Sequence, residues 1–186
     1  MQYQAVVFDM DGVIFDTERL VIEFWKEVAK KHNIPNVEHT CIQCLGTNRV
    51  RTREIFLENY GADFPFDPYR AEVTELFNTH YKGVPLPTKP GVRELLSYLQ
   101  EQDIKVGLAS STAQHLVRDE IGTAGLLPYF QTLVCGDMVE HSKPAPDIFL
   151  KACEILNADP TKSIAIEDSF NGIRSALCCG MTVRSF

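Results

Sequence analysis

The sequence predicts an α/β fold, with a Rossmann-like parallel β-sheet core and an inserted α-helical cap domain. Short apolar runs, typical of fully buried strands, alternate along the chain with helical patterns. This alternation predicts a parallel sheet with helices on both faces and right-handed connections. One early stretch, residues 17–82, shows helical patterns but no buried-strand run. It is therefore predicted to form a separate helical unit.

Five apolar runs are predicted as the strands of the core, and four helical patterns separate them. The predicted strands are Gln4–Phe8, Ile104–Ala109, Thr132–Cys135, Ser163–Ile166 and Met181–Val183. The predicted helices are Val92–Gln100, Ala113–Ile121, Asp147–Leu156 and Phe170–Cys178.

Three further helical patterns make up the predicted cap: Leu20–Lys31, Arg49–Asn59 and Tyr69–His80. The proline-containing segments Asn33–Pro35 and Phe64–Pro68 interrupt them. Because the chain enters and leaves this insertion at neighbouring points, we expect a movable cap. The predicted domains are residues 1–15 with 83–186 for the core, and 16–82 for the cap.

The composition argues against several classes of partner. The chain has 186 residues and a formal net charge of −7, whereas nucleic acids and anionic membranes attract basic surfaces. No apolar run approaches the roughly 20 residues of a membrane helix, and Met1–Gln4 does not resemble the start of a signal peptide. We expect a cytoplasmic protein with a small-molecule substrate. The sequence leaves the oligomeric state open, with a monomer favoured.

The six cysteines include one pair, Cys41 and Cys44, with CxxC spacing. This spacing occurs in redox and metal sites, but no second pair and no suitably spaced histidines accompany it. Reduced, structural cysteines are therefore favoured over a zinc or redox motif.

Two acidic residues follow the first predicted strand directly: Asp9 and Asp11, with Gly12 after them. Carboxylates are costly to place at the end of a buried strand, and open parallel sheets bind ligands at that edge. The glycine allows a tight turn beside a ligand. An aspartate-rich turn without further function remains the alternative.

The strand that ends at Ile166 is also followed by two acidic residues, Glu167 and Asp168. If this strand neighbours the first, its carboxylates meet Asp9 and form an oxygen-rich site suited to Mg²⁺. Several carboxylates in one crevice repel one another unless a cation lies among them. Asp168 and Ser169 can also cap the following helix.

Two further segments carry groups that suit a phosphate. Ser110, Ser111 and Thr112 follow a predicted strand and precede a helix, where hydroxyls and free N–H groups can bind an anion. A plain helix cap is the alternative. Lys143 precedes Pro144 and Pro146 at the start of another helix, and the prolines restrict where its side chain can point.

These four motifs, in this order, resemble those of haloacid dehalogenase superfamily phosphatases that have a helical cap after the first strand, the group that contains β-phosphoglucomutase. The resemblance covers essentially the whole chain. It implies that Asp9 is the nucleophile that forms an aspartyl-phosphate and that Asp11 is the general acid and base. It also implies an Mg²⁺ ion held by Asp9, the Asp11 carbonyl and Asp168, with Glu167 beside them.

The resemblance further implies that Ser110, with Ser111 beside it, binds the phosphate and that Lys143 balances its charge. In the cap, Gly46 and Arg49 match a loop of the mutases, and Arg49 is a candidate clamp for a second anionic group of the substrate. A solvated charge on a helix is an equally supported interpretation of Arg49.

A phosphatase is favoured over a mutase because the mutases carry a histidine at the position of Val21. No histidine precedes His32 in this sequence. Trp25 lies where the mutase also has a tryptophan, but core packing explains it as well. A binding protein of the same fold is a third alternative, although no motif aspartate is lost.

The resemblance also predicts more chain than this sequence has after the fifth strand, because the family continues beyond the segment Val183–Phe186. From this we expect a truncated product with a poorly covered sheet edge and low stability.

Overall fold

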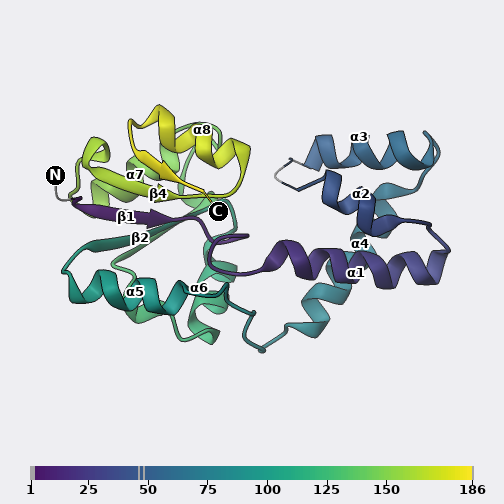
Figure 1. Cartoon of the computed structure of the whole chain (residues 1–186), viewed down its shortest axis with the longest axis horizontal. Helices are drawn as coiled ribbons and strands as arrows, with labels where there is room; N and C mark the ends of the chain where they lie inside the picture. The colour runs from purple at the N-terminus through teal and green to yellow at the C-terminus, as the bar shows by residue number, and fades with distance from the viewer. Residues whose placement is uncertain (1–2, 46, 48, 186) are drawn as a thin grey trace. The chain divides into compact units, whose positions relative to one another are not determined.

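The computed structural model describes residues 3–45, 47 and 49–185. The chain forms two compact units (Figure 1). The larger consists of Met1–Asp16 and Pro85–Phe186, and the smaller is the insertion Thr17–Val84.

The larger unit contains a five-stranded parallel sheet of order β3-β2-β1-β4-β5. The strands are β1 (Ala5–Phe8), β2 (Lys105–Ser110), β3 (Thr132–Cys135), β4 (Ser163–Ile166) and β5 (Thr182–Arg184). The central strand β1 is fully buried, and its last residue, Phe8, pairs in register with Leu108 of β2 and Ile166 of β4. The residues that follow these strands therefore emerge at one edge of the sheet.

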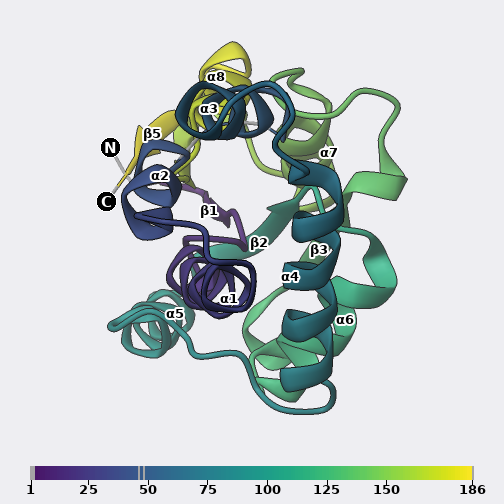
Figure 2. The ribbon, with the colours of Figure 1, turned by 90° about the vertical axis from the view of Figure 1, so that its right-hand side faces the viewer.

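Helices cover both faces of this sheet (Figures 1 and 2). One face carries α7 (Asp147–Ile155) and α8 (Phe170–Cys178), and the other carries α5 (Val92–Glu101) and α6 (Gln114–Thr123). Each helix buries an apolar stripe, as the 3.6-residue period requires. In α7 the buried residues are Ile148, Phe149, Ala152 and Cys153, which join one core with strand residues such as Val7 and Ala165.

The described part of the larger unit also has three short 3₁₀ turns: η1 (Leu127–Tyr129), η2 (Gly136–Met138) and η3 (Pro160–Lys162). Helix α8 begins at an N-cap, where the Ser169 hydroxyl accepts a hydrogen bond of 3.0 Å from the Gly172 N–H. This cap places the loop 167–169 directly at the carboxyl edge of the sheet.

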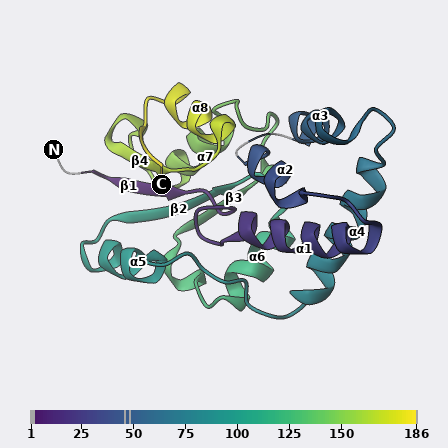
Figure 3. The ribbon, with the colours of Figure 1, turned by 45° about the vertical axis from the view of Figure 1, so that its right-hand side comes forward.

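The described residues of the smaller unit form the helices α1 (Thr17–His32), α2 (Val37–Gln43), α3 (Arg49–Tyr60) and α4 (Phe66–His80) (Figure 3). Aromatic side chains form its core. The ring of Trp25, which is 2% exposed, lies 4.4 Å from that of Phe56 and 5.9 Å from that of Phe66. Trp25 is thus a core residue of this unit.

Helix α2 was not predicted from the sequence. It has only seven residues and begins after Asn36, whose backbone is left-handed, so it is too short to show a clear period. Cys41 is buried in it and Cys44 caps its end, and both thiols are free. Burial raises the pKa of Cys41 to about 12, which is the reverse of what a reactive thiol needs.

Three strands also differ by one residue from the predictions, since β1 begins at Ala5 and β2 at Lys105. Strand β2 continues to Ser110, and β5 lies at Thr182–Arg184 because residues 182–184 pair in register with β4. Within the described residues, no helix combines the length and apolar character that a membrane span requires.

Candidate active site

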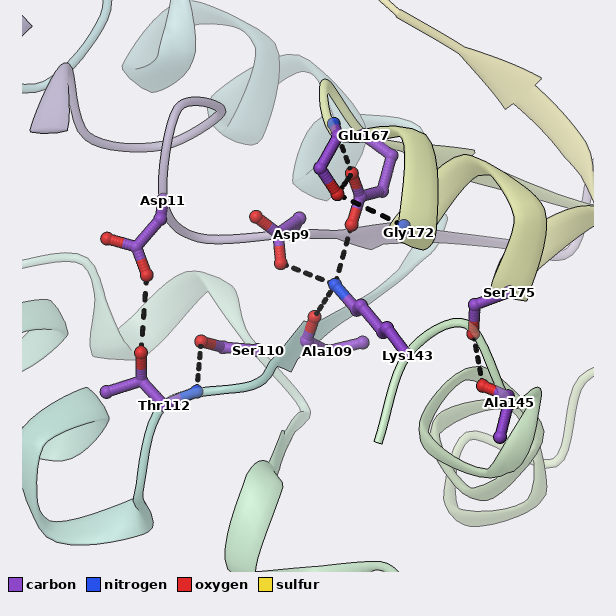
Figure 4. Close-up of polar contacts among 11 residues, drawn as sticks. Asp9, Asp11, Ala109, Ser110, Thr112, Lys143, Ala145, Glu167, Gly172 and Ser175 are labelled. Carbon is purple, nitrogen blue, oxygen red and sulfur yellow. Dashed lines mark hydrogen bonds and ion pairs between the residues drawn. The ribbon is translucent and has the colours of Figure 1, made fainter. Parts of the chain in front are cut away.

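Asp9 lies at the centre of a charged cluster at the carboxyl edge of the sheet (Figure 4). It follows β1 directly and is 7% exposed. Its Oδ1 atom accepts a hydrogen bond of 2.6 Å from Lys143 Nζ. A buried carboxylate with a lysine this close is a strong ion pair in a poorly solvated site.

Lys143 is held by three acceptors. Besides Asp9, its Nζ donates to Glu167 Oε1 at 2.7 Å and to the Ala109 carbonyl at 2.9 Å, which uses all three N–H bonds of the ammonium group. The ammonium also lies 5.0 Å from the ring centre of Phe149. Burial lowers the pKa of Lys143, but the charges of Asp9 and Glu167 outweigh it and raise the pKa overall. The lysine therefore stays protonated.

Glu167 is fully buried, and the first turn of α8 fixes it. Its Oε2 accepts hydrogen bonds from the N–H of Ser169 at 2.8 Å and from the Ser169 hydroxyl at 3.0 Å. A Cβ atom at Gly172 would lie 1.6 Å from Glu167 Oε1. The carboxylate fits there because residue 172 has no side chain.

Asp9, Glu167 and Asp168 each offer one carboxylate oxygen, and these atoms all lie within 4.8 Å of one another. Gly12 has a φ of +76°, and a Cβ at this position would lie 1.9 Å from Asp168 Oδ2, so the glycine leaves room for that carboxylate. The cluster thus has three carboxylates, and Lys143 contacts two of them, Asp9 and Glu167. This all-oxygen, net negative set fits a hard divalent cation such as Mg²⁺.

Burial raises the pKa of Asp9 to about 7, against the lowering effect of Lys143, and the charges of Glu167 and Asp11 raise it further. The protein by itself thus stabilises the three negative charges poorly. Asp11 does not add its carboxylate to the cluster of three. The contact predicted between Asp11 and the metal would use its backbone carbonyl instead.

The loop after β2 lies beside Asp11. The Thr112 hydroxyl donates to Asp11 Oδ2 at 3.2 Å, and the Thr112 N–H donates to the buried Ser110 hydroxyl at 3.1 Å. Ser111 is exposed. Thr112, the third hydroxyl residue of the predicted phosphate-binding loop, therefore connects this loop with the predicted acid and base.

Gly136 is a supporting residue to which the sequence patterns assigned no role. A Cβ atom there would lie 2.2 Å from the Ser111 carbonyl oxygen, and the Gly136 N–H donates to the Thr112 carbonyl at 3.0 Å. The close approach of the two loops requires glycine. One sequence signal was available, because Gly136, like Gly12, lies just after a buried strand.

Comparison with known proteins decides the family. The model of the family described as haloacid dehalogenase-like hydrolase matches residues 6–185. The chain belongs to this family. The predicted family, fold and enzyme class, a phosphohydrolase of the haloacid dehalogenase type, are confirmed.

Three curated relatives illustrate what this hydrolase is similar to. A phosphorylated carbohydrates phosphatase of Thermotoga maritima is 33% identical over 96% of this chain and 82% of its own length. A β-phosphoglucomutase of Bacillus subtilis is 34% identical over 96% of this chain and 80% of its own length. A fructose-1-phosphate phosphatase of Escherichia coli is 30% identical over 97% of this chain and 94% of its own length. A solved structure from Thermotoga maritima is 33% identical, covers 98% of this chain and 84% of that one, and superposes with a TM-score of 0.75.

Of the two predicted cap residues of this hydrolase, the structure describes Arg49, which lies in the smaller unit. Arg49 begins α3, its side chain is 80% exposed, and it donates to Asp67 Oδ1 at 3.3 Å. Gly46 lies outside the described residues. The roles of both in substrate binding remain predictions.

Proposed function

We propose that this hydrolase is a Mg²⁺-dependent phosphatase that acts on a small phosphorylated metabolite, a sugar phosphate or similar phosphomonoester. One observation carries the proposal. The Asp9 carboxylate lies at the carboxyl edge of the sheet, with Oδ1 2.6 Å from Lys143 Nζ, and forms one cluster with the carboxylates of Glu167 and Asp168. A phosphoryl group needs this combination of an anionic nucleophile and neutralising cations.

In this proposal Asp9, Asp168 and the Asp11 carbonyl hold the Mg²⁺ ion, with Glu167 beside them. The fit rests on the three converging carboxylates, whose oxygens are the ligands that Mg²⁺ prefers. When bound, the ion neutralises charge on the nucleophile and on the phosphoryl oxygens.

The protein groups then perform two displacements. An Asp9 oxygen attacks phosphorus, the bond to the leaving oxygen breaks, and Asp11 donates a proton to that oxygen. Water attacks the aspartyl-phosphate, Asp11 takes its proton, and the bond between phosphorus and Asp9 breaks to release phosphate. The Thr112 hydroxyl, 3.2 Å from Asp11 Oδ2, orients the acid and base.

Lys143 and the loop after β2 act on the phosphoryl group in this mechanism. The buried ammonium of Lys143 supplies a fixed positive charge. Ser110 and the more exposed Ser111 offer hydroxyl and N–H donors to the phosphoryl oxygens.

Two relatives support the proposed substrate class, because they are named for phosphorylated carbohydrates and for fructose 1-phosphate. A small-molecule phosphate ester is thus the proposed partner, and nucleic acid is not. The cytoplasmic location and the monomeric state stay predictions.

A mutase is the second candidate, because a β-phosphoglucomutase is among the relatives at 34% identity. Val21 lies in α1 where the resembling mutases have a histidine. The phosphatase is preferred for that reason.

Phosphate release from a panel of small phosphorylated metabolites, including β-glucose 1-phosphate, tests the proposal. We expect release in the presence of Mg²⁺, loss of activity in EDTA and recovery when Mg²⁺ is restored. Interconversion of glucose phosphates without release would favour the mutase. Full activity in chelator would contradict the role given to the carboxylates.

Replacing the nucleophile gives a sharper test. Asp9→Asn should lower turnover about a thousandfold or more, because no other group takes over nucleophilic attack. The exposed Asp103, replaced in the same way by Asn, serves as the control and should keep full activity. Appreciable activity of Asp9→Asn would exclude the aspartyl-phosphate route.

The predicted clamp is tested by comparing two arginines of α3. Arg49→Ala should raise KM for substrates with a second anionic group more than for substrates without one. Arg53, which contacts the same partner, Asp67, at 3.2 Å, is the matched control. Equal effects of Arg49→Ala on both kinds of substrate would indicate a solvated charge.

A further inference from the structure

A buried hydroxyl ties the loop that carries Lys143 to helix α8. Ser175 is 0% exposed, and its Oγ donates to the Ala145 carbonyl at 2.6 Å (Figure 4). One turn further on, the Cys179 sulfur lies 3.4 Å from the Pro146 carbonyl oxygen. Two successive turns of the helix thus contact two consecutive carbonyls of the loop.

We propose that Ser175 is a positioning residue for Lys143. Ala145 lies two residues after Lys143, between Pro144 and Pro146. Each proline ring restricts its own φ angle, and the Ala145 N–H donates to the Ser142 carbonyl at 3.0 Å. A loop with so little freedom moves as one piece, so a hydrogen bond at Ala145 also fixes the backbone of Lys143.

Accurate placement matters because the Lys143 ammonium has three acceptors, at 2.6, 2.7 and 2.9 Å. A shift of about 1 Å takes at least one of them out of hydrogen-bond range. The N-terminus of α8 also fixes Glu167, through Ser169. Helix α8 therefore positions both partners of the ion pair: Glu167 through the cap residue Ser169, and Lys143 through Ser175.

A purely structural role, in which Ser175 only helps to seat α8 on the core, is the competing explanation. Ser163 provides the matched control. It is also 0% exposed, and its Oγ donates to a backbone carbonyl, that of Asp159, at 2.8 Å. It begins β4, at the opposite edge of the sheet from Lys143. Ser163→Ala and Ser175→Ala thus lose the same kind of bond in different places.

The experiment compares these two variants by two measurements on the full chain. Amide hydrogen exchange of residues 142–147 reports on the loop directly. The affinity for inorganic phosphate with Mg²⁺, measured by calorimetry, reports on Lys143. Ser175→Cys, which keeps a weak donor, is the third variant.

In Ser175→Ala we expect faster exchange in residues 142–147 and phosphate binding weakened roughly fivefold, the loss that corresponds to about one hydrogen bond. Ser175→Cys should lie between it and the wild type. Ser163→Ala should lose comparable stability but leave both measurements unchanged.

Unchanged loop exchange in Ser175→Ala, or equal weakening of phosphate binding in both alanine variants, would overturn the proposal. The phosphate measurement rests on the proposed function, whereas the exchange measurement does not. If the wild-type protein binds no phosphate, the proposed function fails, and the exchange in residues 142–147 still decides whether Ser175 holds the loop.

Discussion

At the scale of single residues, the balance of charge around Asp9 is decided by burial. Lys143 Nζ lies 2.6 Å from Asp9 Oδ1, and a positive charge this close lowers the pKa of a carboxyl group. Desolvation and the neighbouring Glu167 outweigh it, so the pKa of Asp9 rises from 3.8 to about 7. Near neutral pH the metal-free protein thus leaves Asp9 only partly ionised, and a bound cation would shift it toward the ionised form.

This shift predicts a pH-dependent stability. A carboxyl group whose pKa is raised by folding stabilises the native state fully below its ordinary pKa, and that contribution is lost as the pH rises through about 7. In EDTA, the melting temperature of the wild-type protein should therefore fall between about pH 6 and about pH 8 relative to that of Asp9→Asn. Thermal melts of both proteins across this range measure the difference.

The comparison with Asp9→Asn is needed because Glu120 titrates in the same range. Burial, with Asp11 and Asp119 nearby, raises the pKa of Glu120 to about 7, and both proteins contain it. Mg²⁺ should remove the deficit of the wild-type protein. Parallel pH profiles of the two proteins in EDTA would show that Asp9 is not the group responsible.

At the scale of elements, the first turn of α8 is shaped around the Glu167 side chain. Gly172→Ala would place a Cβ 1.6 Å from Glu167 Oε1, so the carboxylate must move away from Lys143 and the predicted metal position. We expect Mg²⁺ affinity, measured by calorimetry, to fall about tenfold or more, in the range seen when groups around a metal site are disturbed.

Gly122 in α6 is the matched control for this substitution. A Cβ there would meet the flexible end of Leu127 at 3.3 Å, and alanine favours a helix over glycine by up to ~1 kcal/mol. Gly122→Ala should therefore leave Mg²⁺ binding unchanged. A similar Mg²⁺ affinity for Gly172→Ala and Gly122→Ala would mean that Glu167 does not need its present position.

At the scale of the whole molecule, the predicted catalytic groups and the single tryptophan belong to different units. The cluster of three carboxylates lies in the larger unit, and Trp25 lies in the aromatic core of the smaller one. Tryptophan fluorescence therefore reports on the unfolding of the smaller unit, while far-UV circular dichroism reports on both.

Phe56→Ala should separate the two signals. Phe56 is 0% exposed and packs on Trp25, and truncating a buried phenylalanine costs about 3–5 kcal/mol. We expect the fluorescence transition to move well below the main transition seen by circular dichroism.

Leu126, also 0% exposed but in the larger unit, gives the reciprocal control. Leu126→Ala should lower the main dichroism transition more than the fluorescence transition. If both variants show one coincident transition by both methods, the two units unfold as one.

The sequence alone determined the order of elements and the positions of the acidic motifs. Buried strands and amphipathic helices have distinct local periods, and a carboxylate that ends an apolar strand is visible without a structure. Asp9, Glu167 and Asp168 could be named in this way, and Lys143 from the two prolines that follow it and from the family resemblance. The structure brings the four together. Their roles in catalysis remain predictions.

Only the tertiary structure decided how these residues are supported. No local period in the sequence indicates any of three supporting contacts. These are the approach of Gly136 to Ser111, the space that Gly172 leaves for Glu167, and the hydrogen bond from Ser175 to Ala145. The short helix α2 was not predicted for a related reason, since its seven residues bury too few side chains to show a pattern. Local patterns identify the groups that carry charge, whereas packing between distant segments fixes where those charges lie.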